Sequence, residues 1–112
     1  MTYPVTIGTN EAWQMRMLRD ATTVRRAIRG ARSGTNSVVG IVTTMNALSL
    51  GKVNEILMTR RFAERHPAEG ASVMMLAAIS GATITTVTGV AELELELVGG
   101  IAARLRRTAA AR

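Results

Sequence analysis

The strongest constraint on the fold of this chain is a strand, helix and strand pattern in its middle. VNEILMT at residues 53–59 is typical of a buried strand, and every residue of TITTVT at residues 83–88 is β-branched. Between them, residues 68–80 carry the apolar pattern of a helix, which Pro67 can open and Gly81 can end. Two strands joined through one helix by short loops pair in parallel, with a right-handed crossover. The predicted fold class is therefore α/β.

A long amphipathic helix is predicted for residues 11–32. Residues 1–9 carry Pro4, Gly8 and no apolar period, so we expect a flexible lead-in there, and Asn10 can cap the helix through its side-chain oxygen. On a helix of this length, apolar side chains fall on one face and arginines on the other. The apolar face comprises Trp13, Met17, Ala21, Val24, Ile28 and Ala31, and the arginines are Arg19, Arg25, Arg26, Arg29 and Arg32.

The next segment, VVGIVTTMNALSLG at residues 38–51, predicts a short strand followed by a short helix. Gly40 marks the junction between the two, and Gly51 is placed to end the helix. The buried stripe of this helix consists of Ile41, Met45 and Leu48. Further along, the polar segment RRFAERH at residues 60–66 is expected to be a loop.

One domain is expected, because a chain of 112 residues is near the commonest domain size and can bury a core without disulfides. We expect residues 10–112 to form this domain, with residues 10–33 as its entry helix. No apolar run approaches the ~18–20 residues that span a bilayer. The N-terminus also lacks a basic segment followed by a hydrophobic one. A cytoplasmic protein without a membrane partner is therefore expected.

The segment AELELELVGGIAARLRR at residues 91–107 admits two structures. Its alternation of glutamate and leucine favours a hairpin that turns at Gly99 and Gly100. Its helix propensity favours a short helix that these glycines end, followed by a strand from Ile101 to Leu105. The two interpretations are nearly even on the residues alone.

The titratable residues exclude most kinds of active site. The chain has no cysteine, which removes disulfides and thiolate chemistry, and its only histidine, His66, cannot form a histidine pair. We expect His66 in an exposed loop or at a helix start. The three glutamates Glu92, Glu94 and Glu96 are expected on a solvated face, and Asp20 beside neighbouring arginines. No enzyme activity, metal or cofactor is expected.

Two segments resemble the third domain of eukaryotic and archaeal class 1 release factors, of Pelota and of bacterial proteins built on the same plan. The first is VVGIVTTMNALSLGKVNEILM at residues 38–58, and the second is LVGGIAARLRR at residues 97–107. In the first segment, the matching positions are Gly40, Thr44, Ala47, Leu48, Gly51, Val53 and Leu57. In the second, the matching features are the GGI and LR patterns of the closing strand.

The resemblance implies a three-layer α/β/α sandwich with a small mixed sheet, of the type shared with ribosomal kink-turn-binding proteins. It also implies a helix before Gly99 and Gly100, which with Gly40 and Gly51 are the expected structural glycines. The catalytic Gly-Gly-Gln tripeptide of the family's other domain does not occur in this chain. The resemblance thus implies a non-catalytic interaction module of translation termination or ribosome rescue, either a fragment or a stand-alone relative. Its expected partners are a protein and the ribosome or ribosomal RNA.

RNA binding through a basic face, without kink-turn specificity, is the alternative function. Fourteen basic and eight acidic residues give a formal charge of +6, which favours polyanions. The candidate RNA contacts are Arg25, Arg26, Arg29, Arg32, Arg60 and Arg61. In kink-turn readers, an Asn, a Glu and a Lys read the RNA at the start of the helix that corresponds to residues 41–50. Val42, Thr43 and Asn46 stand at those places here, so specific kink-turn recognition is not expected.

Overall fold

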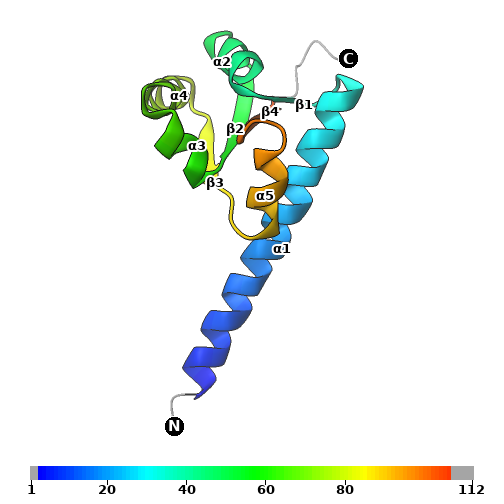
Figure 1. Cartoon of the computed structure of the whole chain (residues 1–112), viewed down its shortest axis with the longest axis vertical. Coiled ribbons are helices and arrows are strands. Elements are labelled where there is room, and N and C mark those ends of the chain that lie inside the picture. The colour runs from blue at the N-terminus through cyan, green and yellow to red at the C-terminus, as the bar shows by residue number, and fades with distance from the viewer. Residues whose placement is uncertain (1–2, 107–112) are drawn as a thin grey trace.

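The computed structural model describes residues 3–106 of the chain. It is an α/β fold with a small mixed sheet, which confirms the predicted fold class (Figure 1). The elements in chain order are α1 (Tyr3–Ser33), β1 (Ser37–Val39), α2 (Ile41–Ser49), β2 (Val53–Met58), α3 (Arg60–Arg65), α4 (Pro67–Ser80), β3 (Thr83–Thr86), α5 (Val90–Glu96) and β4 (Ile101–Leu105).

The sheet has four strands in the order β1-β4-β2-β3. Strands β2 and β3 pair in parallel, with Ile56 opposite Ile84, so the predicted strand, helix and strand unit is confirmed. Strand β4 lies antiparallel to both β1 and β2 and places Ala103 opposite Ile56. The last strand of the chain is therefore central in the sheet, where it joins β1 to the parallel pair.

Helices cover both faces of this sheet, because its central strands alternate their side chains between the two sides. Ile56 and Met58 of β2 belong to a core cluster with residues of α2, α3 and α4. Leu57, between them in sequence, packs instead in a second cluster with residues of α1 and α5. Figure 1 shows the same division, with α1 and α5 on one side and α2, α3 and α4 on the other. The three layers follow from this alternation.

Helix α1 begins at Tyr3, so the expected start near residue 11 and the expected cap at Asn10 are wrong. Pro4 lies in the first turn, where its missing amide breaks no hydrogen bond, and Gly8 alone is too weak a breaker to stop the helix. The N-terminal turns of α1 extend beyond the body of the molecule (Figure 1). The side chain of Trp13, expected on the apolar face, lies outside the described part of the chain.

Residues 60–65 form helix α3 and not the expected loop. The hydroxyl of Thr59 accepts a hydrogen bond from the Phe62 amide at 3.0 Å, which caps the first turn. Phe62 is 2% exposed and belongs to the core cluster beneath α2 and α4. A cap and one buried aromatic side chain thus make a polar-looking segment helical.

The segment before the double glycine is a helix, α5, as the family resemblance implied. Ala91 and Leu95, four residues apart, are fully buried and pack with Val24 and Ala27 of α1. A hairpin would place Leu93, Leu95 and Leu97 on one face, whereas α5 buries only Leu95 of the three. Packing against α1 therefore decides between the two interpretations.

Candidate interaction surface

Three of the four expected structural glycines meet at one end of the sheet. A Cβ atom on Gly99 would lie 3.5 Å from the Cα of Gly40, and the Gly40 amide donates to the Ile101 carbonyl at 2.9 Å. Gly51, the fourth, follows α2 and has no atom within 4 Å of the place its Cβ would take. The two segments that carry the family resemblance are thus in contact through Gly40 and Gly99.

Gly100 is held beside the carboxylate of Glu96. Its φ is +80°, and an added Cβ would lie 2.8 Å from Glu96 Oε2 and 3.1 Å from the Cβ of Phe62. Its amide donates to the Leu95 carbonyl at 2.9 Å, and its carbonyl accepts from the Thr59 amide at 3.0 Å. Only glycine combines this left-handed backbone with so little space.

Glu96 is the polar centre of this end of the molecule. Its carboxylate accepts hydrogen bonds from the Thr59 hydroxyl and, at 2.8 Å, from Nη2 of Arg65. The Thr59 hydrogen bond is the largest cause of a lowered pKa of Glu96, and burial acts in the opposite direction. The hydrogen bond and charge of Arg65 and the charge of Arg61 lower the pKa further. Glu96 therefore acts as an ionised anchor between α3 and α5.

The glutamates of α5 do not form the solvated face that the sequence predicted. Glu94 pairs with Arg25 of α1 at 3.2 Å, and its side chain is 31% exposed. Glu96 pairs with Arg65 of α3 on the other side, with 14% of its side chain exposed. Glu92 is half-buried. The carboxylates of Glu94 and Glu96 thus reach sideways to the neighbouring helices, away from the outer face of α5.

The outer face of α5 is apolar. Val90, Leu93 and Leu97 are 53%, 61% and 86% exposed, and their spacing of three and four residues places them along one stripe of the helix. We call these three residues the α5 ridge. The ridge was not predicted, although a helix over residues 91–97 places Leu93 and Leu97 one turn apart on the same face.

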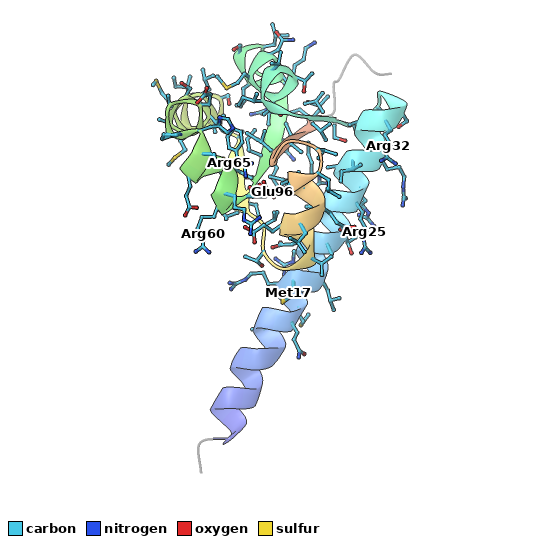
Figure 2. The ribbon with its side chains drawn as sticks, viewed as in Figure 1. Met17, Arg25, Arg32, Arg60, Arg65 and Glu96 are labelled. Atoms are coloured by element: carbon cyan, nitrogen blue, oxygen red, sulfur yellow. The ribbon has the colours of Figure 1, made fainter. Side chains whose placement is uncertain are left out.

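Arginines lie on both sides of the α5 ridge. Arg25, Arg29 and Arg32, the α1 arginines, line a hollow of roughly 340 Å³ together with Ile28, Leu97 and Val98. Arg60, Arg61 and Arg65, the α3 arginines, come from the helix on the other side of α5. Figure 2 shows α5 between Arg60 and Arg65 on one side and Arg25 and Arg32 on the other.

The predicted basic residues are thus divided between two helices, and an apolar stripe lies between them. Arg26 is exposed on α1 but does not line the hollow. Within residues 3–106, the ion pairs involve Arg25, Arg60, Arg65 and Arg104. In that part of the chain Arg29, Arg32 and Arg61 have no carboxylate within salt-bridge distance, so their charge faces solvent.

The outer face of α4 is a second apolar surface. Met74, Met75 and Ile79 are 58%, 62% and 76% exposed. Ala71 and Ala78 continue this stripe and are also exposed. As in the α5 ridge, none of these side chains is charged.

The positions that would contact RNA in a kink-turn-binding protein offer few free polar groups in this chain. Val42 is 79% exposed and apolar. The hydroxyl of Thr43 donates to the carbonyls of Val39 and Gly40 within its own helical turn. Asn46, at the third position, is exposed. Only one of these three side chains therefore offers a polar group that is not already hydrogen-bonded to the backbone.

The remaining candidate residues have structural surroundings. His66 is exposed between α3 and α4, with its ring 5.1 Å from that of Phe62. Asp20 is 5% exposed and accepts hydrogen bonds from the amide and hydroxyl of Thr88. It lines a hollow with Arg16 and Arg19, as expected, but within the described residues its hydrogen-bond partner is Thr88 and not an arginine. Within the described residues, no group of three or more histidine or acidic side chains is placed to hold a metal ion. None of the described helices has both the length and the apolar character needed to cross a membrane.

Comparison with solved structures places this fold beside Pelota and an archaeal release factor. Pelota of Archaeoglobus fulgidus matches with a TM-score of 0.72 and 21% identity over 85% of this chain and 31% of that one. A ribosome-bound archaeal Pelota, in a model with ABCE1, matches with a TM-score of 0.68 and 20% identity over 88% and 29%. An archaeal translation termination factor matches with a TM-score of 0.58 and 24% identity over 80% and 26%.

This chain thus spans about three tenths of the length of the structures it resembles. At these identities the likeness shows the fold. No protein-family model matches the chain. No curated protein matches it at a significant level.

Proposed function

We propose that this chain is a non-catalytic interaction domain, related to the third domain of class 1 release factors and Pelota, that acts in translation termination or ribosome rescue. The observation that carries the proposal is the contact between Gly40 and Gly99, because it joins the two segments whose residues resemble that domain. The fold likeness to two archaeal Pelota structures supports the same assignment.

The domain assignment determines which activities the proposal includes. We propose residues 10–112 as one such domain, with the part of α1 from residue 10 to 33 as its entry helix. In the family, a separate domain with a Gly-Gly-Gln loop acts on peptidyl-tRNA, and that tripeptide is not found in this sequence. The proposed role is therefore docking: the domain holds a protein partner near the ribosome and leaves the ester bond of peptidyl-tRNA untouched.

Cosedimentation with ribosomes tests this proposal. The purified chain is mixed with bacterial or archaeal ribosomes and centrifuged through a sucrose cushion at low and at moderate salt. The proposal expects a saturable fraction of the chain in the ribosomal pellet, with an unrelated protein of equal positive charge as control. A chain that stays in the supernatant with both kinds of ribosome, or that pellets no more than the charge control, contradicts the proposal. Release of the amino acid from charged, blocked tRNA by the chain alone contradicts its non-catalytic part.

RNA binding by the α1 arginines is the second candidate function. Arg25, Arg29 and Arg32 recur at i, i+4 and i+7, and all three line one hollow, which favours contact with a phosphate backbone. Titration of a structured RNA at several salt concentrations tests this candidate. Each Arg→Ala substitution that removes an arginine from a phosphate group lowers the salt slope of log Kd by about 1. Affinity that is indifferent to salt and to these substitutions contradicts it.

A further inference from the structure

The α5 ridge is an apolar surface within an otherwise charged region. Val90, Leu93 and Leu97 are each more than half exposed, whereas Ala91 and Leu95 of the same helix are fully buried. Helix α5 is therefore apolar on its inner and on its outer side. The inner side is explained by packing on α1, whereas the described residues leave the three outer side chains more than half exposed. An apolar surface of this kind, bordered by charged groups, is typical of a site for a partner.

The charges around the ridge have a definite sign. Glu94 and Glu96 are held by Arg25 and Arg65, so each carboxylate of these two pairs is neutralised by its arginine. Beyond these pairs, Arg29 and Arg32 lie on the α1 side and Arg61 belongs to α3, whereas the half-buried Glu92 of α5 has no ion pair among the described residues. Arginines thus outnumber carboxylates beside the ridge, and positive charge prevails there, most clearly on the α1 side.

We infer that the α5 ridge docks an amphipathic helix of a protein partner, with an apolar stripe over Leu93 and Leu97 and acidic residues on both flanks of that stripe. From Val90 to Leu97 the ridge is about 10 Å long, which matches two turns of such a helix. The leucines supply buried apolar area, and the arginines on either side set the orientation and favour carboxylates. The inference rests on the proposed function for one premise only, that the chain docks a protein.

RNA fits the same surface less well. A phosphate backbone can pair with the arginines but leaves Leu93 and Leu97 against charged or hydrated groups. Bases could cover the leucines, but binding of unstacked bases generally uses aromatic side chains, and the ridge and its bordering arginines include none. An apolar ridge between two basic borders therefore favours a protein helix over RNA.

A second copy of this chain is also a poor occupant. A symmetric dimer through the ridge would bring the α1 and α3 arginines of one copy against the same arginines of the other. The apolar face of α4 gives no comparable indication of its occupant. The α4 face is therefore useful as a control surface.

The test uses three synthetic peptides and the full chain. The acidic peptide is a helix former with a leucine stripe between two rows of glutamate. The basic peptide has lysine in place of glutamate, and the scrambled peptide has the acidic composition with the leucines distributed around the helix. Each is labelled and titrated by fluorescence anisotropy. We expect the acidic peptide to bind at least about tenfold more tightly than the other two.

Matched variants locate the binding. Leu93→Ser with Leu97→Ser should weaken binding of the acidic peptide about tenfold, whereas Met75→Ser with Ile79→Ser on α4 should leave it unchanged. Arg29→Glu with Arg61→Glu should weaken it similarly, and Lys52→Glu should not. Far-ultraviolet circular dichroism confirms that each variant is folded. Equal binding of the three peptides, or equal effects of the α5 and α4 variants, would overturn the inference.

A structured RNA hairpin provides the competing outcome. RNA that binds more tightly than the acidic peptide, and whose affinity is indifferent to the leucine substitutions, overturns the inference in favour of an RNA surface. Ribosome cosedimentation separates this result from the proposed function. If the chain pellets with ribosomes but does not bind the acidic peptide, only the inference about the α5 ridge is contradicted. Binding of the peptide without cosedimentation contradicts only the proposed ribosomal role.

Discussion

The guanidinium of Arg65 and the carboxylate of Glu96 join α3 to α5, with Nη2 of the arginine 2.8 Å from Oε1 of the glutamate. The other carboxylate oxygen accepts from the hydroxyl of Thr59, the residue that caps α3. The same oxygen lies where a side chain on Gly100 would have to fit. A single ionised side chain thus holds the start and end of α3, the end of α5 and the turn into β4.

Glu96→Gln should lower stability at neutral pH and make it less sensitive to acid. The folded pKa of Glu96 is lowered from its ordinary value of 4.5, so its ionised form stabilises the fold. That contribution is fully present above the unfolded pKa and is lost as pH falls through the folded pKa. Urea unfolding of the parent chain and of Glu96→Gln at neutral and at acidic pH measures this contribution. The difference between their free energies of unfolding should be smaller at the lower pH.

Glu69→Gln is the control for this pH dependence, because Glu69 is exposed in the first turn of α4. Its effect on the free energy of unfolding should be within a few tenths of a kcal/mol. A stability difference between Glu96→Gln and the parent chain that persists unchanged at low pH would show that ionisation of Glu96 does not stabilise the fold.

Gly100→Ala should destabilise the protein more than Gly51→Ala does. Both residues have positive φ, +80° and +70°, so both substitutions strain the backbone by about 1–2 kcal/mol. At Gly100 the new methyl group also meets Glu96, Phe62 and Thr59, whereas at Gly51 nothing lies within 4 Å. The expected losses are roughly 2–4 kcal/mol for Gly100→Ala and roughly 1–2 kcal/mol for Gly51→Ala. Equal urea midpoints for the two variants would contradict the crowding at Gly100.

The elements predicted well from sequence are those whose signals are local. Helix α4 begins at Pro67 and is followed by Gly81 in the left-handed conformation, as the residue types indicate. Helix α3 was missed because its six residues are stabilised largely from outside: Thr59 lies at the end of β2, and the buried contacts of Phe62 come from other elements. The start of α1 differs from the prediction because Pro4 lies in the first turn, where proline is tolerated, and one glycine at position 8 costs too little to end a long helix.

Only the arginines of the candidate surface could be predicted from local sequence signals, because the position of α5 depends on contacts between distant residues. The arginines are evident in the sequence, and both groups were identified. The position of α5 between them depends on the packing of Ala91 and Leu95 against α1, which involves residues about 70 positions apart. The alternation of glutamate and leucine favours a hairpin and the helix propensity of the same residues favours a helix, so the outward position of the leucines is evident only once the helix is known.

Asp20→Ala should cost about 1–3 kcal/mol, because it removes a nearly buried acceptor from the Thr88 amide and leaves that amide without its partner. Asp20→Asn keeps an oxygen at the same place and should cost less. Thermal unfolding of the two variants gives the comparison. We expect Asp20→Ala to unfold at a lower temperature than Asp20→Asn. The reverse order would mean that α1 is not held to the turn before α5 through this hydrogen bond.

Gly30 and Ser37 provide a test in which the effect of Gly30→Ala on stability should change sign between two backgrounds. Gly30 lies in α1, and a Cβ there would collide with the hydroxyl oxygen of Ser37, which donates to the Ala27 carbonyl at 2.5 Å. Gly30→Ala should therefore destabilise the parent chain by about 1–3 kcal/mol. In the background of Ser37→Ala the collision is absent, since the remaining contacts are no closer than 3.6 Å.

In that background Gly30→Ala should stabilise the protein by up to about 1 kcal/mol, because alanine is the better helix former. Ser37→Ala alone should cost about 1 kcal/mol for the lost hydrogen bond, and the Ala27 carbonyl keeps its place within the helix. A double-mutant cycle of urea unfolding measures all four proteins and gives the coupling energy directly. If Gly30→Ala had the same sign and size in both backgrounds, α1 and β1 would not be in contact at this point. Helix α1 would then have to pack on the sheet in a different position.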